Sequence, residues 1–183
     1  MRSGGGVGHD CPMTWTAPEV ERPDGEFDCD ERPMVEDFLA SQRSTLLLKC
    51  AGLTGEQLMR RSVEHSGLSL LGLIRHMAKV ERIWFRERFA GQSVERLYST
   101  DDWKDADFED LDPARAEEDY ARLLEEVRLA DAAVADASLD DTFTLSGKPA
   151  SLRLIYLHMI EEYARHNGHA DMLREGIDGV TGE

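Results

Sequence analysis

The sequence predicts an all-α fold, a bundle of four helices with a long crossover between the second and the third. Four segments of roughly 20 residues repeat apolar residues at spacings of three and four, the period of one helix face. Proline, serine or glycine marks the ends of these segments. No stretch rich in valine, isoleucine and threonine alternates apolar with polar residues as a half-buried strand does. Amphipathic helices must bury their apolar faces against one another, which favours a bundle.

The first predicted helix begins near Pro33, a residue that suits a first helical turn, and ends at Gly52 or Gly55. Its periodic positions are Val35, Phe38, Leu39, Gln42, Leu46, Cys50 and Leu53. The second runs from about Ser69 to Phe89 and carries the clearest apolar face. That face consists of Leu70, Leu73, Ile74, Met77, Val80, Trp84 and Phe85.

The third predicted helix runs from Pro113 to about Ala137. Its apolar side is formed by Ala116, Tyr120, Leu123, Leu124, Val127 and Val134. The fourth begins at Ser151, a suitable N-cap, and ends at Gly176. Its apolar side is formed by Leu154, Ile155, Leu157, Ile160, Ala164 and Leu173.

These helices place one domain over residues 31–178, after a leader of residues 1–30 and before a short tail, 179–183. The leader is rich in glycine and proline, and Trp15 either anchors it to the body as an extended arm or belongs to a disordered tail. The link 92–112 carries eight acidic and two basic residues. Because structureless loops of this length are uncommon, it is predicted to be an ordered strap or lid; the alternative is a solvated acidic crossover.

Length and charge limit the functions that this chain can have. Its 183 residues suffice for one domain with an apolar core. The formal net charge of −16 opposes binding to nucleic acids and to anionic membranes. No apolar run is long enough for a signal peptide or a membrane span. We therefore expect a cytoplasmic protein that binds neither nucleic acid nor membranes.

The three cysteines, Cys11, Cys29 and Cys50, do not suggest a disulfide framework, because their number is odd and two lie in the leader. Cys50 falls in an apolar helical run, where a buried, inert thiol is more common than a nucleophile.

Three of the six histidines crowd into the fourth predicted helix. One carboxylate and three imidazoles share a face of this helix, because at 100° per residue they lie at about 0°, 40°, 80° and 20° around its axis. In the order of these angles, they are His158, Glu162, His166 and His169. Apolar residues flank the same face, so part of this polar row must meet the core. His9 and His65 fall in the leader and in a loop, and we expect both at the surface.

A buried row of imidazoles and a carboxylate is costly unless something satisfies it, and a divalent cation does so well. Glu162 and His166 have the spacing of two ligands on one helix, and His76, on the apolar face of the second helix, is the obvious third. Two histidines and a carboxylate leave positions open and suit zinc first, or iron or nickel. From spacing alone, His158 or His169 can replace either partner, and His169 can instead carry protons. Taken alone, His76 would be a hydrogen-bonded core histidine.

The segments LIRHMAKVERIWF and LHMIEEYARHNGHADMLRE resemble the DinB-like superfamily of four-helix-bundle metalloproteins, and so does the stretch STLLLKCAGLTGEQLMRRSVEHSGLSLLGL. The resemblance covers roughly residues 30–178. In that superfamily a histidine of the second helix and a pair at i, i+4 of the last helix bind a divalent metal. The resemblance assigns this role to His76, Glu162 and His166, just before the step Asn167-Gly168.

Many members have histidine where this chain has Glu162, and the set here resembles instead the mycothiol-dependent maleylpyruvate isomerase branch. This implies a metal-dependent S-transferase or isomerase that joins a low-molecular-weight thiol to small electrophiles. An excess of arginine, 17 against 4 lysines, fits an actinobacterial source, in which the thiol is mycothiol. The sequence leaves open whether two copies of the chain form a homodimer.

Two other functions stay open at this point. In metal-assisted hydrolysis, Glu161 or His169 would move protons. The other is a non-catalytic bundle that binds metal and serves in stress or in interaction with a partner. In such a bundle, protein side chains would occupy every coordination position of the metal. Some neighbouring side chains can either hold a substrate and wall the site, or form ordinary ion pairs and core contacts. These are Arg75, Arg82, Arg86, Arg165, Trp84 and Phe85.

Overall fold

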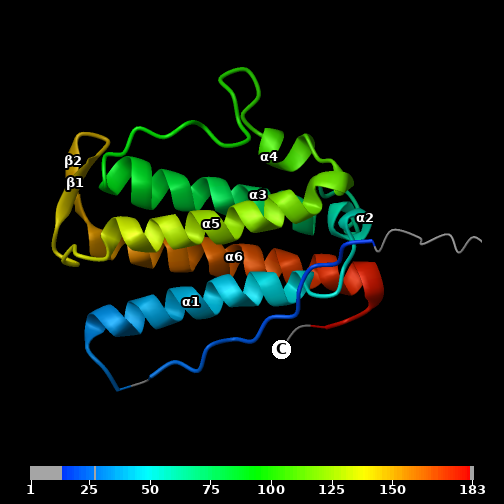
Figure 1. Cartoon of the computed structure of the whole chain (residues 1–183), viewed down its shortest axis with the longest axis horizontal. Helices are drawn as coiled ribbons and strands as arrows, with labels where there is room; N and C mark the ends of the chain where they lie inside the picture. The colour runs from blue at the N-terminus through cyan, green and yellow to red at the C-terminus, as the bar shows by residue number, and fades with distance from the viewer. Residues whose placement is uncertain (1–13, 27, 182–183) are drawn as a thin grey trace, which may run out of the picture.

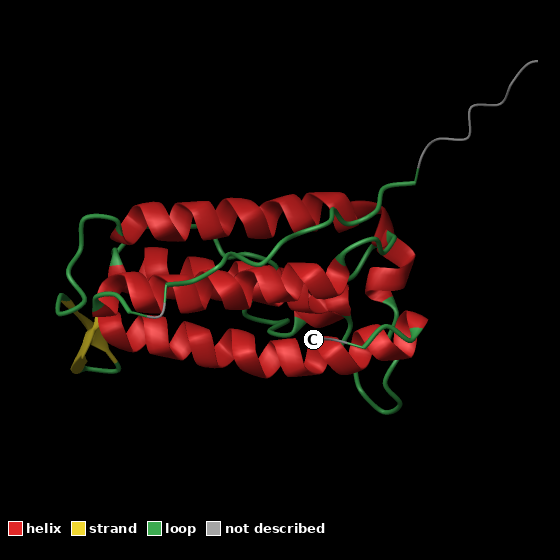
Figure 2. Cartoon of the chain, turned by 90° about the horizontal axis from the view of Figure 1, so that it is seen from below, coloured by secondary structure: helices red, strands yellow, loops and turns green. Residues whose placement is uncertain are grey.

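The computed structural model describes residues 14–26 and 28–181, and within them the chain is mostly helical, as predicted. The long helical segments lie side by side (Figures 1 and 2). They are α1 (Glu31–Cys50), α3 (Leu70–Glu81) with its π-helical continuation η1 (Arg82–Phe89), α5 (Ala116–Val134) and α6 (Leu152–Asp178). None of the described helices has the length and apolar character needed to cross a membrane. Since α3 and α5 run in the same direction (Figure 1), the connection from η1 to α5 must return along the molecule.

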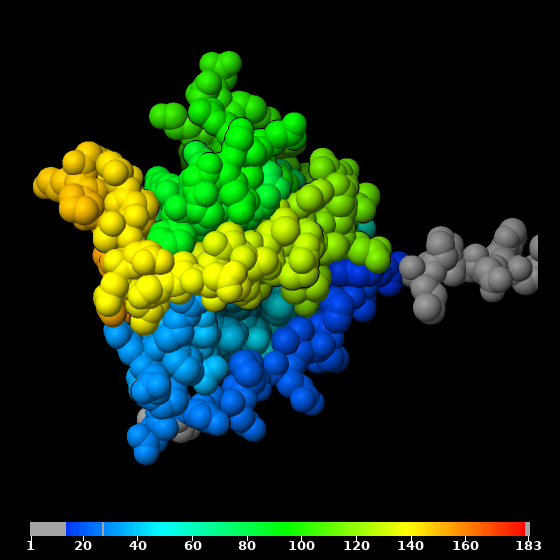
Figure 3. All heavy atoms as spheres, turned by 60° about the vertical axis from the view of Figure 1, so that its left-hand side comes forward, coloured from blue at the N-terminus to red at the C-terminus, as the bar shows by residue number. Residues whose placement is uncertain are grey.

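This connection, residues 92–112, is hereafter the strap. It forms a separate ridge beyond α5 (Figure 3), contains the short helix α4 (Ala106–Glu109) and leads into the 3-10 turn η2 (Pro113–Arg115). Asp107 on α4 is fully buried, whereas the other seven acidic residues of the strap are exposed. The strap is thus solvated and acidic along most of its length and seated on the body at α4.

Between α5 and α6 the chain forms a β-hairpin that the sequence pattern does not predict. Strand β1 (Thr142–Leu145) pairs antiparallel with β2 (Lys148–Ser151). Ser146 and Gly147 form the turn with φ of 51° and 78°, and positive φ at both positions matches the twist of the flanking strands. Strands of four residues are too short for their alternation to stand out against the neighbouring helices.

Another short helix, α2 (Gly55–Met59), follows α1 and begins with a capping box at Thr54. The last helix was predicted to end at Gly176. It continues instead to Asp178 and is capped by Gly179, whose φ is +79°. Gly176 instead allows Ser62 to approach the backbone of α6 closely. A Cβ at this position would lie 2.8 Å from the Cβ of Ser62, whose hydroxyl donates to the Leu173 carbonyl at 2.7 Å.

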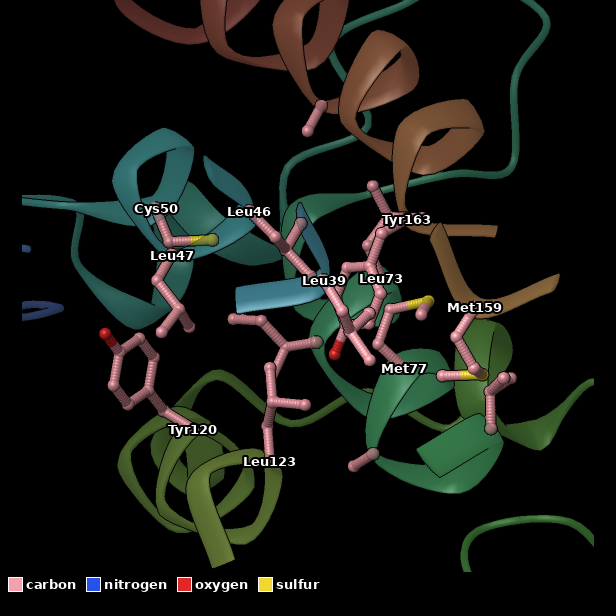
Figure 4. Packing of buried hydrophobic residues seen from close by; sticks show 14 of the residues in the cluster. Leu39, Leu46, Leu47, Cys50, Leu73, Met77, Tyr120, Leu123, Met159 and Tyr163 are labelled. Atoms are coloured by element: carbon pink, nitrogen blue, oxygen red, sulfur yellow. The ribbon is translucent and has the colours of Figure 1, made fainter. Parts of the chain in front are cut away.

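The core lies between the long helices, and Figure 4 shows side chains from all of them meeting there. Among these are Leu39 and Leu46 of α1, Leu73 and Met77 of α3, Leu123 of α5, and Met159 and Tyr163 of α6. The prediction for the buried face of α6 was partly wrong, because Leu154 and Leu157 are 42% and 55% exposed. Apolar residues occur around most of the first two turns of this helix, so the pattern there does not define one face. The polar row of α6 consequently lies at the flank of the buried face.

One buried polar network, hereafter the Arg43 network, joins α1, α3, α5 and α6. The carboxylate of Glu81, fully buried, accepts two hydrogen bonds of 2.7 Å from the Arg43 guanidinium. The Tyr163 hydroxyl donates to the same carboxylate at 2.9 Å, and Arg43 also donates to Asp131 at 2.8 Å. Burial alone would lower the pKa of Arg43, but Glu81 beside it raises the pKa above its usual value.

The described part of the leader lies against the body. The backbone of Ala17 accepts from the Gly52 N–H at 2.8 Å and donates to the Leu53 carbonyl at 2.9 Å. The ring of Trp15 meets Tyr120 edge-on, with the centroids 5.9 Å apart. These contacts support the interpretation of Trp15 as an anchor.

Cys50 is buried, and burial raises the pKa of its thiol to about 12, as expected for an inert cysteine. Cys29 is half-buried and has a free thiol. The predictions for His9 and Cys11 concern positions outside the described residues.

Candidate metal centre

His76 of α3 and the pair Glu162 and His166 of α6 come together where these two helices pack, hereafter the His76 cluster. One nitrogen or oxygen atom of each side chain lies within 4.8 Å of the other two. The three side chains are 19%, 19% and 12% exposed, in that order. Among the described residues, this is the one group of histidine, cysteine and acidic side chains found close enough to hold a metal ion.

His76 is held from behind by the strap. Its Nδ1 lies 2.9 Å from Oδ2 of Asp107, and the ammonium of Lys79 lies 2.5 Å from the same oxygen. Burial favours the neutral form of Asp107, but the hydrogen bonds from His76 and Lys79 outweigh it, so the pKa of Asp107 is below its usual value. The ring of Phe108 stacks on the His76 imidazole at a centroid distance of 4.9 Å.

Arg75 fixes this part of the strap to the body. Its buried guanidinium donates to the carbonyls of Ala106 and Asp107, both at 3.2 Å. It also pairs with the buried carboxylate of Asp119 on α5 at 3.1 Å and lies over the ring of Tyr98 at 4.0 Å. The sequence pattern does not single out Asp107, because it is one of eight acids in the strap. Only its place next to Phe108, the one large apolar residue of α4, hints that it is buried.

Glu162 lies between two imidazoles on its own helix. Its oxygens are 3.5 Å from Nε2 of His158 on one side and 3.5 Å from Nε2 of His166 on the other. These distances exceed those of good hydrogen bonds. No lysine or arginine of the described chain pairs with Glu162. Burial, then the neighbouring His76 and His169, lower the pKa of His166 to about 4, so its imidazole is neutral at pH 7.

The other histidines take different places. His169 has its Nδ1 3.4 Å from Nδ1 of His166 and is half-buried, at the edge of the cluster. The ring of His158 lies against that of Trp84, tilted by 51° at a centroid distance of 4.2 Å, and His158 lies outside the group of three. The side chain of His65 is 91% exposed, as expected of a surface residue.

The four arginines considered as substrate-binding residues are all engaged within the protein. Arg75 pairs with Asp119, as described above, and Arg82 and Arg86 both bind the buried carboxylate of Glu126 on α5. Arg165 pairs with Glu161 at 2.5 Å, and both of these side chains are more than half exposed. Glu161 therefore points away from the cluster's buried side.

The two aromatic residues differ. Phe85 is fully buried and meets Tyr156 edge-on at 5.6 Å, so it belongs to the core. Trp84 is half-buried between the His158 ring and the guanidinium of Arg88, which lies 4.0 Å from its centroid.

A cavity of about 310 Å³ opens between α3, η1 and the strap. Its walls include Lys79, Ile83, Arg88, Leu97 and Thr100. The three residues of the His76 cluster do not line it, but Lys79 connects the two places because its ammonium binds the carboxylate that holds His76.

Comparison with known proteins assigns a family to this arrangement. The family model described as mycothiol S-transferase matches residues 34–179, which is most of the chain. No curated protein and no solved structure gave a significant match. The match includes α3 and α6 over their whole lengths and therefore every residue of the cluster. The chain thus belongs to the mycothiol S-transferase family within the DinB-like superfamily, which indicates in general terms a transferase that uses mycothiol.

Proposed function

We propose that this chain is a metal-dependent transferase that joins the sulfur of mycothiol to small electrophiles, in a four-helix bundle of the DinB-like type. His76, Glu162 and His166 hold the metal in this proposal. The observation that carries it is the meeting of these three side chains within 4.8 Å. Family membership supports the thiol and the transfer, and the cluster supports the dependence on metal.

The donor set fits a divalent cation. Two imidazole nitrogens and a carboxylate oxygen form the ligand set of many catalytic zinc sites, with room for a further ligand. His166 is neutral at pH 7 because its pKa is lowered to about 4, so a lone pair is available on its ring. Glu162 has no cationic partner among the described lysines and arginines and meets its neighbours at 3.5 Å. We favour zinc, and iron and nickel are the other candidates.

A divalent cation bound at these side chains lowers the pKa of a thiol that binds beside it and so favours the nucleophilic thiolate near neutral pH. Most of the surface of Glu162, His166 and His76 is buried, so these side chains would also keep the thiol in a partly dry environment. In the transfer, the S–H bond breaks, the sulfur electron pair forms a bond to the electrophilic carbon, and the leaving group departs with its own pair. We assign the released proton to His169, which lies at the half-buried edge of the cluster.

The test measures metal content and thiol consumption together. Purified wild-type protein should contain about one divalent ion per chain by elemental analysis. It should consume mycothiol in the presence of a haloaromatic, or isomerise maleylpyruvate only when mycothiol is present. The variants His76→Ala and His166→Ala should lose both properties. His65→Ala removes an exposed histidine and should retain both.

Three results would contradict the proposal in different ways. Equal thiol consumption by wild type and His166→Ala would exclude the cluster from the reaction. Turnover of the electrophile without any thiol would favour metal-assisted hydrolysis. A metal ligated by four protein side chains, His158 included, would favour a non-catalytic bundle.

A further inference from the structure

A buried carboxylate behind the proposed metal ligands has no role in the scheme above. Asp107 is fully buried on α4, and its Oδ2 lies 2.9 Å from His76 Nδ1 and 2.5 Å from Lys79 Nζ. Its other oxygen, Oδ1, is buried without a hydrogen-bond partner among the described residues. Leaving a buried carboxylate oxygen unsatisfied is costly, so the position of this side chain is not explained by stability alone.

The hydrogen-bond pattern fixes which nitrogen of His76 carries the proton. Lys79 can only donate, so the shared oxygen of Asp107 is an acceptor, and the Nδ1 of His76 must donate to it. The imidazole can then offer a lone pair to a metal only at Nε2, the ring nitrogen that does not face Asp107. Phe108 stacks on the same ring and limits its rotation.

We propose that Asp107 is the positioning residue for the metal ligand His76, and that the docked strap thereby sets the affinity of the site. The proposal rests on the metal site of the proposed function. A carboxylate that accepts from Nδ1 orients the imidazole, fixes its tautomer and makes Nε2 a stronger ligand. The strap is therefore part of the metal site although it supplies none of the three ligands.

Two further contacts keep Asp107 in place. Arg75 binds the backbone carbonyl of Asp107 itself and that of Ala106, both at 3.2 Å. On α3, Gly72 allows the strap to approach, since a Cβ at this position would lie 3.0 Å from the ring of Phe108. The carboxylate is thus held by a fixed backbone against the helix that carries His76, which is what positioning a ligand requires.

The first measurement is the affinity of the full chain for Zn²⁺, by competition with a chromogenic chelator, together with the absorption spectrum of the Co²⁺-loaded protein. Asp107→Ala should weaken Zn²⁺ binding about 10–100-fold and change the Co²⁺ bands. Asp107→Asn keeps an acceptor oxygen and should lie between Asp107→Ala and wild type. The matched control is Asp110→Asn, which removes a charge from an exposed position of the same strap and should bind as wild type does.

The second measurement needs no metal and separates the inference from the proposed function. Nitrogen-15 NMR of the metal-free protein reports the tautomer of His76, which should be protonated at Nδ1 in wild type. It should shift toward protonation at Nε2 in Asp107→Ala and, to a smaller extent, in Asp107→Asn. Circular dichroism checks that each variant is folded. If Asp107→Ala does not fold, Asp107→Asn and the NMR measurement on wild type still decide.

The outcomes are distinct. Wild-type affinity and an unchanged His76 tautomer in a folded Asp107 variant would overturn the inference and leave the proposed function intact. Failure of the wild-type protein to bind any divalent metal would overturn the proposed function and, with it, the metal-related role of Asp107. Protonation of His76 at Nε2 in the wild type would overturn the inference whatever the metal result.

Discussion

Two polar clusters lie next to each other between α3 and α6, and they differ in how completely their side chains are paired. In the Arg43 network, Glu81 accepts two bonds of 2.7 Å from Arg43 and one of 2.9 Å from Tyr163. In the His76 cluster, Glu162, the sequence neighbour of Tyr163, lies 3.5 Å from each of two imidazoles. Both clusters place a carboxylate at least four-fifths buried between the same helices, but only one of them has a cationic partner for it.

The difference indicates what each cluster is for. A buried carboxylate that already accepts three short hydrogen bonds from a guanidinium and a phenol has little capacity left for a ligand, so its role is to hold helices together. A carboxylate that lies 3.5 Å from two imidazoles, with no ammonium or guanidinium beside it, has unused acceptors. Such a site remains open to a cation. The predictions below test this division, from the largest expected effect to the smallest.

Arg43→Ala should destabilise the protein by about 3–5 kcal/mol, because it leaves the buried Glu81 carboxylate without its cation. Urea unfolding followed by circular dichroism measures this loss. Arg128→Ala, which removes an arginine from an exposed pair on α5, serves as the control and should change stability by less than about 1 kcal/mol. A loss no larger than that of the control would break the comparison, since the Arg43 network would then not be structural.

Adding Zn²⁺ to the metal-free wild type should raise the free energy of unfolding by about 2.7 kcal/mol at a free concentration 100 times the dissociation constant. The cation binds the folded cluster and not the unfolded chain. The same addition to His166→Ala should have no effect. Stabilisation of both proteins to the same extent would place the zinc elsewhere.

Tyr163→Phe should cost about 1.5 kcal/mol in unfolding free energy, because Glu81 loses one of its hydrogen bonds but keeps those from Arg43. Metal content should stay at the wild-type value, although Tyr163 adjoins Glu162 in the sequence. Calorimetry and elemental analysis of one preparation test both statements. Loss of metal in this variant would show that the two clusters are not independent.

Glu162→Gln should change the stability of the metal-free protein by no more than about 0.5 kcal/mol, because the carboxylate makes no contact shorter than 3.5 Å within its cluster. The same substitution should remove tight Zn²⁺ binding. A destabilisation of the metal-free protein as large as that of Arg43→Ala would mean that Glu162 is a structural residue.

The long helices follow from the sequence because their apolar period is strong, whereas the hairpin does not, because its strands are short and end in a tight turn. The end of α6 was misplaced for a physical reason. Gly176 looks like a helix stop but serves the approach of Ser62, a tertiary contact that no local pattern reveals. The exposed positions of Leu154 and Leu157 have a similar cause, since packing against α1 and α3 decides which side of α6 is buried.

The meeting of His76, Glu162 and His166 could be predicted because helical spacing places two of them on one face of the last helix and because His76 lies on the apolar face of the second, and the family resemblance names the same three residues. Asp107 could not be predicted in the same way. It comes from a connection without helical periodicity, and its burial depends on Arg75 and Phe108, which lie elsewhere in the chain or on the strap itself. No spacing in the sequence predicts a residue that orients a metal ligand from a long connection.

The π-helical segment η1 restricts how this region can change in length. A π-turn holds one residue more than an α-turn, and the hydrogen bond from the Ala90 N–H to the Phe85 carbonyl spans five residues. If the same residues were wound as an uninterrupted α-helix, the extra residue would rotate everything that follows by about 100°. Arg86 would then leave Glu126, and Phe89 would leave Phe143. A relative with an α-helix here that keeps these contacts must therefore have one residue fewer in this segment.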